Sequence, residues 1–372
     1  MPNAQDIVRE DLDTLCAKTL RDELARMAGR PLLITGGAGF LGYYLVQAVT
    51  HHNATTIAVE RKIPLTVWDN FSRGVPSWLT HLAETRQLQL ARHDLKQPLP
   101  ADMGEFDWIV HAASIASPTY YRVDPIGTMD ANINGLRNLL DYALARQNAG
   151  RPIQGMLFFS SSEIYGDPDP SNIPTTEDYR GFVSCTGPRA CYDEAKRFGE
   201  TLCVNFARQH GVPVKQARPF NNYGPGLKIT DGRLIPDFAR DILAGRDIRM
   251  LSDGSPTRTF CYSADAIQGY YKILVRGQPG EAYNIGTETP EISVAVLAEK
   301  MIASARDLFG YRGRLVRAQS ADKDYLVDNP NRRCPVIAKA RTQLGYEPLV
   351  SLDEGLRRAL VWYAGNREVE QK

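Results

Sequence analysis

The sequence predicts an α/β protein built on a doubly wound parallel sheet, with a smaller C-terminal α/β lobe. Three observations favour this fold class. Short apolar runs alternate with helical stretches from residue 31 to about residue 218. Most of these runs are apolar on both faces, which is typical of parallel strands that helices cover on two sides. A glycine-rich turn joins the first run to the first helical stretch, and the chain becomes loop-rich after Pro219.

Composition and charge exclude several classes of protein. The chain has 372 residues, is 43% hydrophobic and 23% charged, and carries a formal net charge of +1, which argues against a nucleic-acid or membrane surface as its main partner. No apolar run approaches the roughly 20 residues of a membrane span, and the acidic N-terminus lacks the apolar segment of a signal peptide. The six cysteines are scattered without a CxxC pair, so we expect reduced thiols, a cytoplasmic protein and no metal site.

The chain begins with a predicted amphipathic helix over residues 5–28. Its apolar residues recur near a helical period, with Asp and Arg between them: Ile7, Val8, Leu12, Leu15, Leu20, Leu24 and Met27. We expect this helix to pack on the domain or on a second subunit, and a regulatory role is the alternative.

The rest of the chain divides into two predicted parts. Strands are expected at 31–35, 64–69, 88–94, 107–113, 155–161, 212–219 and 282–286, and helices at 43–52, 128–146 and 189–210. The predicted organisation is an N-terminal helical extension at 1–30, a large domain at 31–218 to which 263–290 returns, and a smaller lobe formed by 219–262 and 291–372.

A glycine-rich loop predicts dinucleotide binding by the large domain. In "LLITGGAGFLG", Gly36, Gly39 and Gly42 have GxxGxxG spacing between a strand and a helix. Such glycines permit a tight turn and a close approach of the backbone to a pyrophosphate, and the helix N-terminus supplies unpaired N–H groups. The large domain is therefore predicted to be a Rossmann domain, with Phe40 and Leu41 also beside the cofactor.

The end of the second strand bears on the choice of cofactor. Asp69, followed by Asn70, can accept hydrogen bonds from ribose hydroxyls and would repel a 2′-phosphate, which favours NAD over NADP. Asp69 lies 27 residues past Gly42, farther than usual, and residues 51–63 look like an insertion. The cations Arg61, Lys62 and Arg73 are nearby, so NADP remains an alternative cofactor. Asp94 could hold the adenine amino group or serve as a helix cap or turn residue; Leu95, Ala112 and Ala113 complete the expected cofactor site.

Three polar side chains suggest alcohol oxidation. Tyr192 and Lys196 are four residues apart and share a face of a predicted helix. A phenol of pKa near 10 is a poor base, but a nearby ammonium and an oxidised nicotinamide favour the phenolate. Ser161 ends an apolar strand upstream of this pair. Tyr192 could then remove a proton from a sugar hydroxyl while a hydride leaves for the cofactor.

Together these residues resemble the extended short-chain dehydrogenase/reductase superfamily, and most closely the UDP-glucuronate decarboxylase (UDP-xylose synthase) family. The resemblance is carried from about residue 31 to 363 by stretches that include "TGGAGFLG", "HAASIASPTYYRVDPI", "SSSEIYGDP", "GPRACYDEAKR", "DGRLIP", "DGSPTRTFCY" and "DNPNRRCPVIAKA". The first 30 residues lie outside it. The resemblance implies a nucleotide-sugar enzyme with tightly held NAD, and a homodimer formed through helices 128–146 and 189–210.

The resemblance also implies a mechanism. The sugar is oxidised at C4 by Tyr192 and NAD, with Ser161 as the hydroxyl partner of the tyrosine. The resulting β-keto acid loses carbon dioxide, C5 is protonated, and C4 is reduced again. Glu163 and Arg258 match the two residues that the family uses around the carboxylate and C5, with Ser162 beside them. Arg258 would grip the carboxylate, and Glu163 would order a water or shuttle the proton. Alternatively, Glu163 is a structural acid in a salt bridge, and Arg258 is a pyrophosphate ligand.

Three more residues resemble the family's substrate contacts, and three positions depart from its pattern. Arg233 resembles the diphosphate-binding arginine, and Asn221 and Ser117 resemble other substrate-side residues; surface salt-bridge roles for Arg233 and Asn221 are the alternative. Gly127 stands in place of a lysine, Gly226 of an arginine and Pro256 of a glutamine. The sugar, the nucleotide and decarboxylation itself are therefore less secure. A 4-epimerase or dehydratase with the same 4-keto intermediate, and a non-catalytic NAD-binding regulator, are the competing interpretations.

Overall fold

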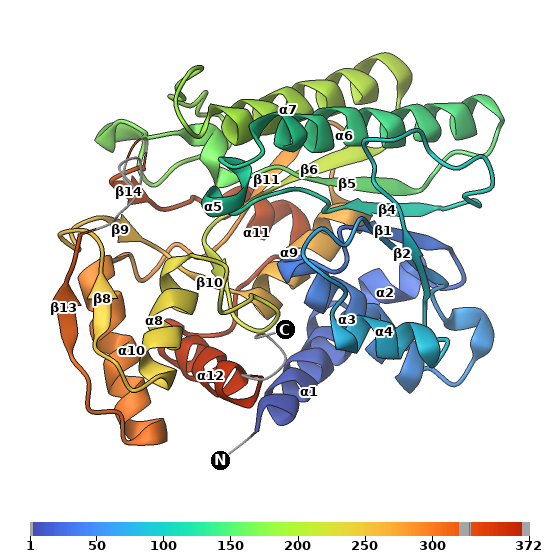
Figure 1. Cartoon of the computed structure of the whole chain (residues 1–372). Helices are drawn as coiled ribbons and strands as arrows, with labels where there is room; N and C mark the ends of the chain where they lie inside the picture. The colour runs from blue at the N-terminus through green and yellow to red at the C-terminus, as the bar shows by residue number, and fades with distance from the viewer. Residues whose placement is uncertain (1–2, 320–326, 328, 367–372) are drawn as a thin grey trace.

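The centre of the fold is a seven-stranded sheet in the order β11-β6-β5-β4-β1-β2-β3, in which every neighbouring pair is parallel (Figure 1). The computed structural model describes residues 3–319, 327 and 329–366. The strands are β1 (Leu32–Thr35), β2 (Leu65–Asp69), β3 (Gln89–Arg92), β4 (Trp108–His111), β5 (Gly155–Phe159), β6 (Val214–Pro219) and β11 (Ala282–Ile285). The predicted fold class is confirmed.

Helices cover both faces of this sheet, because successive strand side chains point to opposite faces. Leu33 of β1 packs with leucines of α6 (Pro125–Asn148) and with α7 (Ala190–His210) on one face. Leu32 and Ile34 pack on the other face with α3 (Phe40–Thr55) and α9 (Ser263–Arg276). In Figure 1, α6 and α7 lie above the sheet, and α3 and α9 lie below it. All four residues of β1 are buried, as a strand covered on two sides requires.

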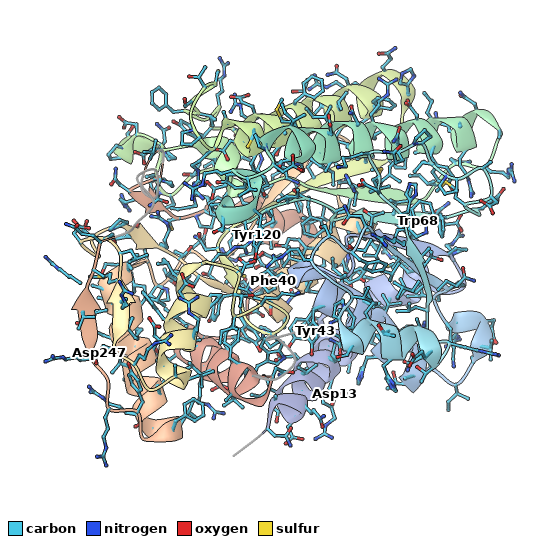
Figure 2. All side chains as sticks on the ribbon, viewed as in Figure 1. Asp13, Phe40, Tyr43, Trp68, Tyr120 and Asp247 are labelled. Carbon is cyan, nitrogen blue, oxygen red and sulfur yellow. The ribbon has the colours of Figure 1, made fainter. Side chains whose placement is uncertain are left out.

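The strand order places a binding crevice at the carboxyl end of β1. The chain passes from β1 to β2 on one side, whereas β4 lies on the other side of β1. Loops that leave β1 and β4 therefore diverge, and ligands bind at such a switch point. Phe40, the first residue of α3, lies near the centre of the molecule at this edge (Figure 2).

The N-terminal segment differs from the single helix that was predicted over 5–28. It forms α1 (Ala4–Thr14), a π-helical segment (Leu15–Thr19) and α2 (Arg21–Met27), with a break at Leu20, whose backbone is not helical (φ −120°, ψ 9°). The break lets the two halves pack on different helices, α1 on α12 (Leu352–Gly365) and α2 on α9. The predicted apolar residues are buried, so the segment lies against its own chain.

The segments predicted to form the smaller lobe, 219–262 and 291–372, contain short strands and, among the residues that the structure describes, four helices. Their strands are β7 (Asn222–Tyr223), β8 (Ile248–Met250), β9 (Thr257–Arg258), β10 (Cys261–Tyr262), β12 (Ile292–Ser293), β13 (Leu315–Arg317) and β14 (Arg332–Arg333). Their helices are α8 (Leu234–Leu243), α10 (Val294–Phe309), α11 (Ala338–Leu344) and α12; α4 (Ser77–Glu84) and α5 (Pro118–Tyr121) complete the large domain. Within the described ranges, none of the helices combines the length and apolar character that crossing a bilayer requires.

Candidate active site

The loop between β1 and α3 has the geometry of a phosphate cradle. Gly36 has φ +76°, and a Cβ there would lie 2.5 Å from the Ala113 nitrogen. A Cβ at Gly42 would lie 2.3 Å from the Gly37 carbonyl oxygen, so neither position can carry a side chain. Gly39 precedes α3 and offers no side-chain cap to its first N–H groups. Those donors are therefore available to an anion such as a pyrophosphate.

This loop opens into a cavity of about 1050 Å³ that runs along the sheet edge into the smaller lobe. Every residue predicted for cofactor, substrate or catalysis lines it. From the large domain these are Gly36, Gly39, Phe40, Leu41, Gly42, Asp69, Asn70, Asp94, Leu95, Ala112, Ala113, Ser117, Ser161, Ser162, Glu163, Tyr192 and Lys196; from the smaller lobe they are Asn221, Arg233 and Arg258. The sheet topology thus brings distant segments to one site.

The part of the cavity that is predicted to hold the adenosine contains Asp69, the last residue of β2. Its carboxylate accepts hydrogen bonds from the backbone N–H groups of Ala38 (3.0 Å) and Phe71 (2.8 Å), and burial raises its pKa. Of the cations that left NADP open, Arg61 and Lys62 precede β2, at the opposite end of the strand from Asp69. Arg73 lines the cavity, but its guanidinium pairs with Asp231 at 2.9 Å.

Asp94 shows features of both roles considered for it. It lines the cavity near Asn70, whose amide donates to it at 3.5 Å. Its other oxygen accepts from the backbone N–H of Lys96 at 3.1 Å, which is a turn contact.

Tyr192 and Ser161 meet in the middle of the cavity. Burial raises the pKa of the Tyr192 phenol to about 12, and its hydrogen bond with Ser161 opposes that rise. Lys196 is also buried, and its ammonium donates to the Phe159 carbonyl oxygen at 2.6 Å. Burial lowers the pKa of Lys196 to about 7. In the protein alone, both groups are therefore biased toward their neutral forms, and a bound ligand must supply the charge that ionises the phenol.

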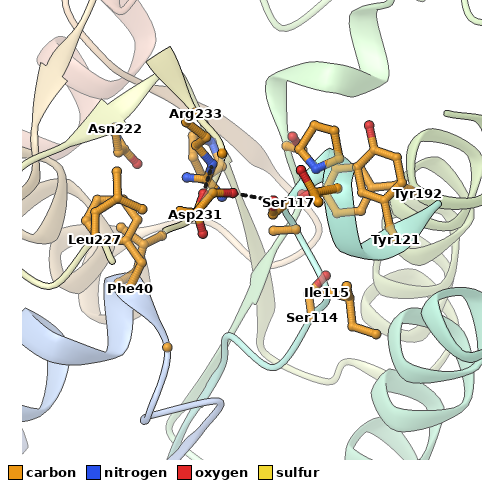
Figure 3. Close-up of a pocket in the computed structure, with 18 of the residues that line it drawn as sticks. Phe40, Ser114, Ile115, Ser117, Tyr121, Tyr192, Asn222, Leu227, Asp231 and Arg233 are labelled. Carbon is orange, nitrogen blue, oxygen red and sulfur yellow. Dashed lines mark hydrogen bonds and ion pairs between the residues drawn. The ribbon is translucent and has the colours of Figure 1, made fainter. Parts of the chain in front are cut away.

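Three further side chains line this part of the cavity and were not predicted. Tyr121 of α5 stacks on Tyr192, with ring centroids 5.2 Å apart and planes 8° apart (Figure 3). The hydroxyls of Ser114 and Ser160 are buried and have no hydrogen-bond partner among the described residues. Unpartnered buried hydroxyls in a cavity indicate a polar ligand. No sequence pattern marks them, because serine after a strand is common.

Glu163 lies between two arginines. It follows Ser161 in a 3-10 turn, and its carboxylate forms ion pairs with Arg189 and Arg333; the second Arg333 contact is 2.9 Å long. Burial alone would raise the pKa of Glu163, but the two guanidinium charges outweigh it and hold the pKa well below its usual range. Sequence reasoning missed both arginines, although Arg189 precedes Tyr192 in "GPRACYDEAKR" and Arg333 lies in "DNPNRRCPV".

The three predicted substrate contacts of the smaller lobe all have partners within the chain. Arg258 is buried and donates to the carbonyl oxygens of Thr257 (2.7 Å), Pro330 and Asn331 (3.1 Å). Burial, and then the charge of nearby Arg333, lower its pKa to about 10. The Asn221 amide donates to the Thr259 carbonyl at 2.8 Å. Arg233 pairs with Asp231 at 2.9 Å, as the dashed line in Figure 3 shows.

Local packing explains why Gly226, one of the three departures from the family pattern, is a glycine. The other two departures, Gly127 and Pro256, also have close neighbours within the chain. At Gly226 (φ +89°) a Cβ would lie 2.4 Å from the Cβ of Tyr43, so the tyrosine excludes a side chain there. At Gly127 a Cβ would lie 2.0 Å from a carboxylate oxygen of Asp124, which caps α6 at this position. Pro256 lines the cavity and accepts from the N–H of Val294 at 3.0 Å. These positions thus have structural roles in this chain.

A phosphate cradle beside a buried tyrosine, serine and lysine is the arrangement expected of the dinucleotide-dependent enzyme that the sequence predicts. Residues 32–286 match the family model described as the NAD dependent epimerase/dehydratase family, and the chain belongs to this family. It is 35% identical over 341 residues to UDP-glucuronic acid decarboxylase 6 of Arabidopsis thaliana, covering 91% of this chain and 90% of the relative. It is 36% identical over 347 residues to UDP-glucuronic acid decarboxylase 1 of Danio rerio, covering 92% and 74%. The resemblance predicted from the motifs is confirmed.

Solved structures agree with the fold. DesIV, a dTDP-glucose 4,6-dehydratase from Streptomyces venezuelae crystallised with NAD, matches with a TM-score of 0.75 at 25% identity, over 91% of this chain and 98% of that chain. The family description supports NAD as the cofactor. The named relatives support the prediction of an enzyme, and of a decarboxylase in particular.

Proposed function

We propose that the chain is an NAD-dependent decarboxylase of UDP-glucuronate or a related nucleotide-uronate, which acts through a 4-keto intermediate. The observation that carries this proposal is the charge around Glu163. Arg189 and Arg333 pair with its carboxylate, and the charge of Arg258 also lowers its pKa. Arg189 also lies 3.8 Å from the buried Asp193 carboxylate, so three guanidinium groups stand against two carboxylates beside Tyr192. The excess positive charge favours an anionic sugar over a neutral hexose.

The cavity on the side of the glycine loop is suited to NAD, which would supply a hydride acceptor for the sugar and later a hydride donor. Gly36, Gly39 and Gly42 would hold its pyrophosphate, and Asp69 its adenosine ribose. Tyr192 would take the proton of the C4 hydroxyl, with Ser161 as its hydrogen-bond partner and Lys196 behind it. Arg233, on the opposite wall in Figure 3, would bind the diphosphate of the nucleotide.

The 4-keto sugar explains how carbon dioxide can leave. When the bond between C5 and the carboxylate breaks, its electron pair moves into an enolate between C5 and the C4 oxygen. Tyr192 and Ser161 hydrogen-bond this oxyanion, so they stabilise charge that develops only at this stage. C5 then takes one proton, and Tyr192 returns its proton to the C4 oxygen as the ketone is reduced. The net change is one proton consumed and one carbon dioxide released.

The pairing of Glu163 limits its role in this scheme. A carboxylate held ionised by two arginines is a poor proton donor at neutral pH. We infer that Glu163 orients the water that protonates C5 and keeps the arginines in place, and that it does not deliver its own proton. This also weighs against the dehydratase alternative, because loss of water requires a protonated acid beside the ring.

The test is incubation of the purified chain with UDP-glucuronate and with a panel of other nucleotide-uronates and nucleotide-hexoses. We expect mass spectrometry to show loss of carbon dioxide from a uronate. An inverted hexose or loss of water would favour the epimerase or dehydratase alternative. Retained NAD without any turnover would favour the non-catalytic regulator, and a chain that neither holds NAD nor alters any nucleotide sugar would refute the proposal.

The variant Glu163→Gln tests the carboxylate. It should leave NAD bound and reduce carbon dioxide release by about 10²-fold or more. Glu291→Gln is the matched control, because Glu291 also pairs with an arginine, Arg332, at 2.8 Å but lies outside the residues that line the cavity. Undiminished turnover of Glu163→Gln would remove Glu163 from the mechanism.

We also propose that the enzyme is a homodimer formed through α6 and α7. Exposed apolar side chains on these helices support this: Ile126 is 67% exposed and Phe198 is 48% exposed, and Met129 is exposed beside them. Light scattering of the purified chain measures its mass directly, and Ile126→Glu should shift a dimer toward monomer. The cytoplasmic location stays a prediction.

A further inference from the structure

Two loops on opposite walls of the cavity are joined by one ion pair. Arg73 belongs to the loop that follows β2, on the cofactor side, and Asp231 belongs to the loop between β7 and α8, in the smaller lobe. The Arg73 guanidinium donates to the Asp231 carboxylate at 2.9 Å. Both residues line the cavity that contains the glycine loop. The pair therefore crosses the cavity from one lobe to the other.

Further contacts converge on the same pair. The Lys228 ammonium donates to the carbonyl oxygen of Arg73 at 2.8 Å. The Arg73 guanidinium also lies over the ring of Tyr120, 4.4 Å from its centroid. On the other side, the Ser117 hydroxyl donates to the Asp231 carbonyl oxygen at 2.9 Å, and Arg233 pairs with the Asp231 carboxylate (Figure 3). These contacts thus join three segments of the chain, those that carry Arg73, Asp231 and Ser117, at one point.

The exposure of the two partners places this fastening at the rim of the cavity. The Asp231 side chain is 3% exposed, whereas the Arg73 side chain is 39% exposed. The loop that carries Asp231 also lies against the start of α3, since a Cβ at Gly226 would be 2.9 Å from the Phe40 carbonyl oxygen. The crossing thus lies beside the glycine loop, and we expect a dinucleotide held on that loop to leave more readily when the two crossing loops separate.

We propose that Arg73 and Asp231, with Lys228, form a clasp that retains the dinucleotide between the two hydride transfers. This inference rests on the proposed function, in which the cofactor must stay bound while the sugar is a ketone. A cofactor that left in its reduced form would strand the oxidised sugar. Arg73 and Asp231 are positioning residues in this role, because they act on the loops and not on the reacting atoms.

The clasp is tested by the rate at which a bound dinucleotide escapes. The chain is loaded with NADH, an excess of NAD is added, and the loss of protein-bound NADH fluorescence is followed without any sugar substrate. We expect Arg73→Ala and Asp231→Asn each to release NADH about tenfold faster than the unmodified chain. The double variant should be no faster than the faster single variant, because the two residues act as one pair.

Control variants and salt separate a clasp from a general loosening of the fold. Arg314→Ala is the control, since Arg314 also pairs with an aspartate, Asp247, but at an exposed site (81% and 41%) outside the residues that line the cavity. It should leave NADH release unchanged. Added salt should speed release from the unmodified chain and have less effect on Arg73→Ala, because the Arg73 guanidinium is partly exposed and salt screens its charge.

Turnover gives a second readout. During reaction with UDP-glucuronate, Arg73→Ala should lose activity progressively and regain it when NAD is added. Unchanged NADH release in both single variants, or independent and multiplicative effects in the double variant, would overturn the clasp alone. Failure of the unmodified chain to bind NADH would overturn the proposed function as well, so the two failures are distinguishable.

Discussion

Replacing Asp11 by alanine should destabilise the folded chain far more than the same change two residues along the same helix. Asp11 lies on the buried face of α1, and its carboxylate accepts hydrogen bonds from three side chains. These are the hydroxyl of Tyr44 in α3, the hydroxyl of Tyr262 in β10 at 2.6 Å, and the guanidinium of Arg358 in α12 at 2.6 Å. One carboxylate thus ties the N-terminal helix to both lobes.

The size of the effect follows from the partners that the mutation leaves behind. A buried polar group left without a partner costs about 1–3 kcal/mol, and removal of one member of a buried ion pair costs about 3–5 kcal/mol. Arg358 is 20% exposed and also pairs with Glu354 at 2.7 Å, so its charge is only partly uncompensated, and the two buried tyrosine hydroxyls carry most of the cost. We therefore expect Asp11→Ala to lower the free energy of unfolding by about 4 kcal/mol.

Asp13→Ala is the matched control. The Asp13 side chain is 62% exposed and pairs with His51 at 2.8 Å, and Figure 2 shows it at the edge of the molecule. The cost of losing such a surface pair is below about 0.5–1 kcal/mol. Asp11→Asn, which keeps the shape and removes the charge, should fall between the two.

Urea unfolding followed by tryptophan fluorescence measures the difference. With a slope of about 3 kcal/mol per molar urea, Asp11→Ala should lower the unfolding midpoint by roughly 1.3 M. A midpoint within about 0.3 M of that of Asp13→Ala would refute the reasoning. The N-terminal helices would then be held by apolar contacts alone, and the carboxylate would be incidental.

Three further predictions concern the cavity. Burial lowers the pKa of Lys196 from 10.5 to about 7, so between these pH values the unfolded chain binds a proton that the folded chain does not. The stability of the cofactor-free chain should therefore rise with pH in this window, by up to about 1.4 kcal/mol per pH unit from this group, and urea titrations should show a shallower rise for Lys196→Met. Gly226→Ala should lower stability by about 1–3 kcal/mol in thermal denaturation, and the double variant with Tyr43→Ala should not recover it, because alanine at position 43 keeps the Cβ that lies 2.4 Å away and the positive φ remains strained. Tyr121→Leu, which removes the ring stacked on Tyr192, should lower kcat about tenfold, whereas Tyr121→Phe should retain kcat within about twofold; equal kcat for the two variants would exclude a role for the ring.

The fold and the predicted part of the cavity lining could be read from the sequence, because local sequence patterns indicate both. Apolar runs bounded by Gly, Asp and Ser gave the strands of the sheet, and the glycine loop identified the strand at its switch point. In a parallel sheet the carboxyl ends of the strands meet at one edge, which is why Asp69, Asp94 and Ser161, each placed at or just after a strand end, line the same cavity. The family motifs added Asn221, Arg233 and Arg258 of the smaller lobe to the predicted site.

Several contacts could not be predicted from the chain, because their partners are distant in sequence. Arg333 pairs with Glu163 across 170 residues, and Asp231 pairs with Arg73 across 158. The sequence suggested that Glu163 orders water or shuttles a proton, and only the neighbouring arginines favour the first of these roles. The break at Leu20 was also missed, since the apolar spacing of residues 5–28 fits one continuous helix.

By itself, the sequence determined the layered α/β fold, the phosphate loop, the tyrosine, serine and lysine, and the family to which the chain belongs. These follow from periodicity, glycine placement and short motifs, which are local properties of the chain. The tertiary structure alone decided which charges face one another: two arginines on Glu163, two on Asp231, and two tyrosines and an arginine on Asp11. Electrostatic energies depend on distances and burial that emerge only when remote segments pack together, and for that reason the charge pairing of the site is decided by the tertiary structure.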